Sequence, residues 1–197
     1  MTNKNNDHLS KTDQELVALA IKRTDDFKYL IDRYEAKLLR YIRRLSNFSS
    51  EDSEDLLQEI FIKVYQNLNS FDDSLKFSSW IYRIAHNQII SQYRKTKSKC
   101  KDLEIKADET LVNNLASEFD LKEMIDQKLT SEKLFKLINN LDKKYKEVLI
   151  LRFFEDKDYR EISDILQKPA GTVAALINRA KKQLKHLLLK KRLIFNI

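Results

Sequence analysis

Aromatic and basic side chains alternate along residues 71–95 in a pattern that suits unpaired nucleic-acid bases. The set comprises, in chain order, Phe71, Phe77, Trp80, Tyr82, Arg83, Asn87, Tyr93, Arg94 and Lys95. Rings stack on unpaired bases, and cations follow the phosphate backbone of a single strand. Core burial is the ordinary alternative for such rings, and we expect it for Phe77 and Trp80. Taken alone, the pattern is compatible with a single-strand site and with a packed helix.

A second set of residues, near the C-terminus, has the parts of a helix-turn-helix. Asp158 and Glu161 form a capping signature for a short helix over 159–166, and the turn 167–169 leads into a long helix from about Ala170. We expect Val173, Leu176 and Ile177 to hold that helix on its own core. The residues expected to face outward are Ala174, Ala175, Asn178 and Lys181. The alternative is an antiparallel helix pair within a bundle.

Composition favours an all-α fold and a polyanionic partner. The 197 residues include one Gly and one Pro, too few for the tight turns of a sheet protein. The formal net charge is +7, with acid-free basic stretches over 81–101 and from Arg179 to the end. Residues 51–59 are instead crowded with acids. Basic and acidic patches on one chain predict surfaces with different partners.

Helical periodicity divides the chain into two units. In the first, a capping box at Ser10 and Asp13 is expected to open a helix, and further helices are expected over about 27–45, 56–68 and 77–94. In the helix expected over 56–68, Tyr65 continues the apolar period. On the last, Tyr82, Arg83, His86, Asn87 and Arg94 are expected on the outer side. A second unit is expected to start near Phe119 or Leu121.

Residues that could support catalysis or metal binding form no recognisable motif in the sequence. The three His residues are scattered, and there is no Gly-rich phosphate loop or nucleophile–base pair. We therefore expect no enzymatic activity, no cofactor and no small-molecule substrate. Cys100 is the only cysteine, so an exposed thiol is expected, with a redox switch as the alternative. Without a signal-peptide core or a membrane-length apolar run, we expect a cytoplasmic protein with no membrane insertion.

Three stretches in order resemble the bacterial sigma-70 family, specifically its extracytoplasmic-function (ECF) class. Residues 55–61, DLLQEIF, are similar to the family's EDLVQEVF helix, and 71–87 to its FD…F…WLYRIARN segment. Residues 145–153, 159–162 and 169–173 are similar to its REVLLLRY…YEEIA…P.GTV module. The resemblance covers about Glu15 to Leu189. It implies a sigma factor that directs promoter-specific initiation, with stress or environmental responses as the usual setting.

For the first unit, the resemblance implies a region 2 domain over 12–96, after a disordered N-terminus over 1–11. Its acidic helix would bind the clamp helices of the largest subunit of core RNA polymerase, since acids suit a basic surface. The residues implied there are Asp55, Leu56, Gln58, Glu59 and Phe61. The loop and helix beyond it would recognise and open the −10 element, with one non-template base flipped into a pocket. The residues implied there are Phe71, Trp80, Tyr82, Arg83, Asn87, Ser91, Arg94 and Lys95.

For the second unit, the resemblance implies a linker over 97–117 and a region 4 domain over 118–197 with a basic C-terminal helix. The basic residues from Lys95 to Lys101 would bind phosphates of the DNA backbone. The helix-turn-helix would read the −35 duplex, while the first helices of this unit would bind the flap of the second-largest polymerase subunit. The residues implied at the −35 element are Arg160, Gly171, Thr172, Ala174, Ala175, Asn178, Arg179, Lys181 and Lys182. An anti-sigma factor is a common further partner in the class.

The chain departs from the family pattern after Gly171-Thr172-Val173. Ala174, Ala175 and Leu176 stand where Lys or Arg, Ser and Arg are common, so −35 recognition should be weaker or rely more on DNA shape. Gln167 and Lys168 also stand in a turn that commonly holds Gly. Two alternatives follow: a stand-alone helix-turn-helix regulator, or a protein whose region 4 serves mainly as an interaction module.

Overall fold

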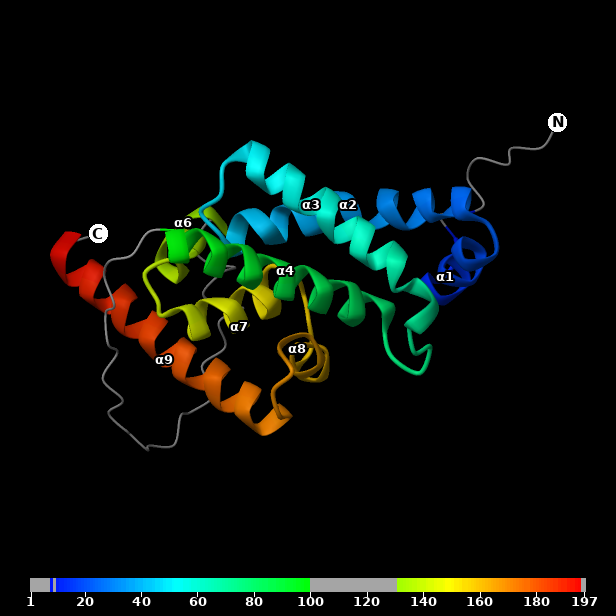
Figure 1. Cartoon of the computed structure of the whole chain (residues 1–197). Helices are drawn as coiled ribbons and strands as arrows, with labels where there is room; N and C mark the ends of the chain where they lie inside the picture. The colour runs from blue at the N-terminus through cyan, green and yellow to red at the C-terminus, as the bar shows by residue number, and fades with distance from the viewer. Residues whose placement is uncertain (1–7, 9, 100–130, 196–197) are drawn as a thin grey trace. The chain divides into compact units, whose positions relative to one another are not determined.

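All regular structure in the described part of the chain is helical, which confirms the all-α prediction (Figure 1). The computed structural model describes residues 8, 10–99 and 131–195. Contacts divide the chain into two compact units, Met1–Lys99 with Arg160–Gln167 and Cys100–Tyr159 with Lys168–Ile197. Residues 97–99 of the linker predicted over 97–117 are helical. The rest of that linker, Cys100 and the helix start expected near Phe119 or Leu121 lie outside the described residues.

The first unit is built on three long helices that contact one another. These are α2 (Lys28–Leu45), α3 (Ser50–Gln66) and α4 (Phe77–Lys99), and Figure 1 shows α2 and α4 running beside α3. The 3-10 turn η1 (Thr24–Phe27) precedes α2, and η2 (Leu68–Ser70) follows α3. Apolar side chains at three- and four-residue steps meet in the core, which is what their spacing predicts.

The N-terminal helix α1 (Asp13–Lys22) has its N-cap two residues later than predicted. Thr12, not Ser10, is the N-cap: its hydroxyl accepts from the Glu15 N–H at 3.3 Å, and Glu15 Oε2 accepts from the Thr12 N–H at 2.7 Å. Asp13 instead accepts from Arg33 Nη1 at 2.8 Å and from the Tyr34 hydroxyl. Because this tertiary pairing occupies Asp13, the predicted box at Ser10 and Asp13 is wrong.

Tyr82 and His86 are buried, so the prediction that they lie on the outer side of their helix is wrong. They stand one turn apart on α4, and both face Tyr41 of α2. The Tyr82 and Tyr41 rings lie 5.1 Å apart, and the Tyr41 hydroxyl is 3.1 Å from Nδ1 of His86. A buried aromatic on the neighbouring helix therefore extends the core around α4 further than the apolar residues of α4 alone indicate.

Tyr65 departs from the predicted pattern in the opposite sense. It follows the apolar period of α3, yet 41% of it remains exposed. Its ring packs against Phe27 at 5.2 Å, and its hydroxyl is 3.0 Å from Oγ1 of Thr24. Tyr65 therefore lies at the edge of the core, with its polar tip in solvent, as tyrosine allows.

The second unit packs α6 (Ser131–Ile138) and α7 (Lys143–Phe153) against α9 (Ala170–Phe195). Its core includes Val148 and Leu149 of α7, and the predicted core residues Val173 and Ile177 of α9 are buried with them. Leu176 is only partly buried. Of the helices in the described residues, none is both long and apolar enough to cross a membrane.

The short helix α8 (Tyr159–Leu166) and the start of α9 are joined by a turn with left-handed backbone at Gln167. Its φ is 52°, a value at which a side chain is disfavoured. The Gln167 side chain partly offsets this cost, because Nε2 donates to the Asp164 carbonyl at 2.7 Å. The expected turn at 167–169 is therefore present, with glutamine in the conformation that glycine usually adopts.

Candidate nucleic-acid interface

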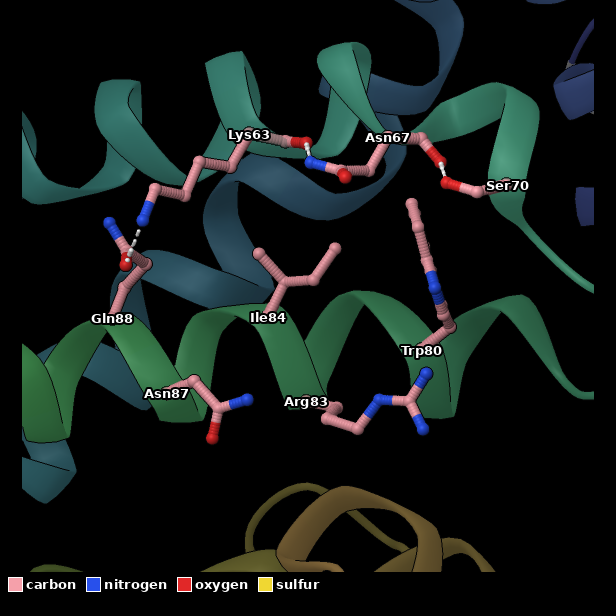
Figure 2. Close-up of a pocket in the computed structure, with 8 residues that line it drawn as sticks. All are labelled: Lys63, Asn67, Ser70, Trp80, Arg83, Ile84, Asn87 and Gln88. Atoms are coloured by element: carbon pink, nitrogen blue, oxygen red, sulfur yellow. Dashed lines mark hydrogen bonds between the residues drawn. The ribbon is translucent and has the colours of Figure 1, made fainter.

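A polar pocket of about 310 Å³ opens between the end of α3 and the first half of α4 (Figure 2). Its lining combines two cations and three carboxamides with one indole ring. The residues are Lys63, Asn67, Ser70, Trp80, Arg83, Ile84, Asn87 and Gln88. Such a lining offers a ring surface, hydrogen-bonding groups and positive charge, which are the features that hold an unpaired nucleotide.

Hydrogen bonds fix the orientation of the α3 side chains in this pocket. Nζ of Lys63 donates to Oε1 of Gln88 at 2.6 Å, across the two helices. Nδ2 of Asn67 donates to the Lys63 carbonyl at 2.8 Å and so caps the last turn of α3. Figure 2 shows Oδ1 of Asn67 turned away from α3 toward the space above α4. The hydroxyl of Ser70 donates to the Asn67 carbonyl at 2.8 Å, which ties η2 to the same group.

Trp80 forms one wall of the pocket and is itself held by other rings. Its ring centroid lies 5.4 Å from that of Phe71 and 5.6 Å from that of Phe77. Trp80 is 7% exposed and Phe77 1% exposed, so the expectation that both are buried is confirmed. Phe71 is partly exposed. The aromatic cluster therefore acts as a rigid support rather than as a row of free stacking surfaces.

The polar residues predicted on α4 form a row along the outer side of the helix. Arg83 is partly exposed, and the others of the row are exposed: Asn87, Ser91, Arg94 and Lys95. Their spacing of three and four residues keeps them on one face. Arg83 and Asn87 also line the pocket, so the row begins at the pocket and continues along α4.

The predicted acidic surface on α3 divides into exposed and buried residues. Asp55, Gln58 and Glu59 are exposed. Leu56 and Phe61 are 3% and 7% exposed, so they pack in the core of this unit. Their role in contacting a partner stays a prediction. Ile62, which the sequence analysis did not single out, continues the exposed face and is 57% exposed.

Most of the residues predicted to read duplex DNA from α9 are exposed. They are Gly171, Thr172, Ala175, Asn178, Arg179 and Lys182, here called the α9 stripe. Ala174 is partly buried. Lys181 is also partly buried, with Nζ 6.0 Å above the Phe153 ring, so its stem is packed on α7. Arg160 on α8 is exposed.

The second unit also contains a buried carboxylate, on α7. Glu147 is 9% exposed, and its burial raises the pKa of the carboxyl, while the charges of Lys143 and Lys168 act in the opposite direction. Burial likewise lowers the pKa of the neighbouring Lys146. Lys168 belongs to the turn before α9, so Glu147 attracts that turn electrostatically.

Five residues that line the pocket were not named in the sequence analysis: Lys63, Asn67, Ser70, Ile84 and Gln88. Lys63 and Asn67 stand four residues apart on α3, a spacing that places them on one face. That spacing was the available signal, although nothing in the sequence shows that α4 lies opposite them. In the parts of the chain that the structure describes, no cluster of His, Cys, Asp or Glu could hold a metal ion.

Comparison with known proteins assigns both units to one family. Residues 30–99 match the family model for sigma-70 region 2, and residues 131–184 match sigma-70 region 4. The chain is 32% identical over 166 residues to the ECF RNA polymerase sigma factor SigW of Bacillus subtilis, covering 82% of this chain and 88% of SigW. It is 34% identical over 182 residues to the ECF sigma-E factor of Escherichia coli K12, covering 87% and 91%.

The chain therefore belongs to the sigma-70 family. Within that family it is an ECF sigma factor, a class of proteins that direct transcription initiation and are not themselves enzymes. The fold agrees with solved structures of CnrH in complex with the cytosolic domain of CnrY (TM-score 0.65, 21% identity, covering 90% and 97% of the two chains) and of RpoE with the anti-sigma factor NepR from Bartonella quintana (0.60, 23%, 83% and 96%). The alternative of a stand-alone helix-turn-helix regulator is not favoured.

Proposed function

We propose that the first unit, taken as 12–96, binds core RNA polymerase through α3 and opens the −10 element through the α3–α4 pocket. The second, taken as 118–197, binds the −35 duplex through α9. The observation that carries the proposal is the pocket, because its indole wall, carboxamides and cations could stack on an unpaired base, bond its edge and neutralise its phosphate. The chain would act in the cytoplasm, where promoter DNA and polymerase meet.

The α3 face supports the contact with polymerase. The carboxylates of Asp55 and Glu59 would contact the basic clamp helices of the largest subunit. Gln58, which lies between them on α3, would add hydrogen bonds to the same polymerase surface. The exposed Ile62 one turn further along would add a desolvated apolar anchor, a common feature of binding hot spots near the centre of a contact. Leu56 and Phe61 keep the backbone of this face rigid from the core side.

The α4 row supports promoter opening. A base flipped out of the duplex loses a few kcal/mol of stacking and pairing, which the pocket must return. Arg83 and Asn87 face both the pocket and the solvent, and Arg94 and Lys95 continue the row along the path that a displaced strand would take. Their charges would neutralise phosphates of that strand.

The α9 stripe supports duplex binding with few polar base contacts. Ala174 and Ala175 can touch thymine methyls, and Asn178, Arg179 and Lys182 can reach base edges or phosphates. Because two long polar side chains common in the class are absent, DNA shape should contribute more to recognition at this element. The first helices of this unit would bind the polymerase flap. An anti-sigma factor, like NepR in its complex with RpoE, would mask these surfaces.

Charge reversal tests the polymerase contact. We expect Asp55→Lys with Glu59→Lys to weaken binding to core polymerase at least tenfold, and Ile62→Ala to weaken it several-fold, in a titration with labelled protein. Glu51→Lys, an exposed acid at the start of the same helix, serves as the matched control. Unchanged binding of the double variant would remove this face from the proposal.

Promoter opening is tested with duplex and pre-melted templates. We expect Asn87→Ala with Arg94→Ala to lower run-off transcription more on duplex promoters than on pre-melted ones, because a melting role is needed only on the duplex. Equal loss on both templates would indicate a simple contribution to affinity and argue against melting.

A further inference from the structure

We propose that the last turns of α9 bind the surface of a membrane that contains anionic phospholipid. The segment is residues 185–197, which follow the stretch matched by the region 4 model, 131–184. The proposed DNA and polymerase contacts do not use this segment. The helix would lie among the lipid headgroups without crossing the bilayer, since no described helix is long and apolar enough to span one.

The core of the second unit supports α9 only as far as Leu184. Leu184 is 1% exposed, whereas Leu187 and Leu188 are partly buried and Leu189 is 49% exposed. The helix nevertheless continues to Phe195, and Figure 1 shows it as one unbroken ribbon. Packing within the unit therefore accounts only in part for the apolar residues beyond Leu184.

The composition of this segment combines positive charge with apolar bulk. From Ile165 to Ile197 the chain has no acid. A basic helix that also carries Leu and Phe is typical of helices that lie in a membrane interface, where cations bind anionic headgroups and apolar groups enter the acyl boundary. The cations of the segment are Lys185, Lys190, Lys191 and Arg192, and its apolar residues are Leu187, Leu188, Leu189, Leu193, Ile194, Phe195 and Ile197.

The exposed side of α9 shows the same combination where its side chains are described. Lys182, Lys185, His186 and Leu189 are all exposed. Their spacing of three and four residues places them on one face of the helix. On such a face, Leu189 can enter the apolar layer while the long lysine side chains keep their ammonium groups at the headgroups.

Duplex DNA explains the cations of this face but not its leucine. Leu189 follows Gly171 by about 27 Å along the helix axis, whereas the major groove is about 12 Å wide. A duplex held by the first turns of α9 offers no apolar surface at that distance. An acidic protein could match the charge, but a bilayer supplies anionic headgroups and an apolar layer together, so the combination favours a membrane surface.

The test measures co-sedimentation of the full chain with lipid vesicles. The probes are vesicles of equal parts phosphatidylglycerol and phosphatidylcholine, compared with phosphatidylcholine alone. We expect binding to the anionic vesicles only, weakening as salt is added. Lys190→Gln with Lys191→Gln should lower the affinity roughly twentyfold, because each cation near an anionic surface contributes about fivefold. Leu189→Ser should lower it about fivefold through lost apolar burial.

Matched variants separate the segment from the overall charge of the protein. Lys22→Gln with Lys144→Gln removes the same charge at exposed lysines of α1 and α7, and it should change vesicle binding little. Leu75→Ser alters a leucine of the first unit that is 36% exposed, and it should also have little effect. Circular dichroism of every variant should show wild-type helix content.

Three results would overturn the inference. The first is a wild type that binds anionic vesicles no better than phosphatidylcholine. The second is an equal loss in the Lys190 and Lys191 variant and in its Lys22 and Lys144 control, which would show that net charge alone attracts the protein. The third is a loss of affinity of Leu189→Ser for duplex fragments with a −35 element, which would place Leu189 in the DNA interface instead.

Discussion

Replacing Gly171 with alanine should stabilise the protein and weaken its hold on duplex DNA. Gly171 is the only glycine in 197 residues, and it lies exposed in the first turn of α9. Its backbone is not left-handed, and a Cβ added there would meet nothing within 4 Å. The fold therefore gives no reason for glycine at this position. A reason outside the fold is the close approach of a DNA phosphate to the helix backbone.

The two effects have opposite signs and different sizes. Alanine is favoured over glycine in a helix by about 0.5–1 kcal/mol, so Gly171→Ala should raise the melting temperature by about 2–8 °C. A methyl group that keeps a phosphate from the amide N–H groups would cost a charge-assisted hydrogen bond, and duplex affinity should fall about tenfold or more.

The assay measures thermal unfolding of the free protein and binding of the polymerase complex to fragments with and without a −35 element. The affinity loss should be confined to fragments that carry the element. Ala170→Gly, one residue earlier, is the control for helix propensity, because it should lower the melting temperature without adding bulk. If Gly171→Ala is stabilised and binds the −35 fragment as tightly as the wild type, the explanation by close approach is wrong.

Two further predictions concern the second unit and the turn before α9. Gln167→Gly should raise the free energy of unfolding by about 1 kcal/mol in chemical denaturation, because a φ of 52° is less favourable for glutamine than for glycine. Loss of the hydrogen bond to the Asp164 carbonyl offsets part of this gain. An unchanged denaturation midpoint would mean that the hydrogen bond offsets all of it. The pKa of Glu147 is raised in the folded state, so the folded carboxyl holds its proton to higher pH, and stability falls as pH rises past the unfolded value of 4.5. Glu147→Gln should therefore stabilise the protein at pH 7 and lose this advantage below about pH 4 in pH-dependent melting curves. A gain of equal size at both pH values would mean that packing, not charge, causes it.

The helices were predictable because their apolar spacing and their caps are local properties of the sequence. The breaks near residue 49 and at 167–169 reflect side chains within four residues of one another. The errors arose where a residue is used by a distant element. Asp13 bonds Arg33 and Tyr34, and Tyr82 and His86 pack on Tyr41, so local rules misplace all three.

The candidate site was predictable only in part, for the same reason. The α4 residues Arg83 and Asn87 were found because they lie within one motif with Trp80. Lys63, Asn67 and Gln88 join them only through the pairing of α3 with α4, which a single sequence does not reveal. Ile62 escaped notice because an apolar residue in an amphipathic helix is ordinarily assigned to the core.

In the proposed function, the single helix α3 would serve both polymerase binding and the single-strand pocket. The 17 residues of α3 span about 25 Å, with the acidic face along its first turns and Lys63 and Asn67 at its far end. If docking shifts α3 relative to α4, the width of the pocket changes with it. Thermodynamic linkage then requires reciprocity: occupation of the pocket must alter affinity for the docking partner by the same factor. The isolated chain and the assembled complex would then differ in how tightly they hold a single strand.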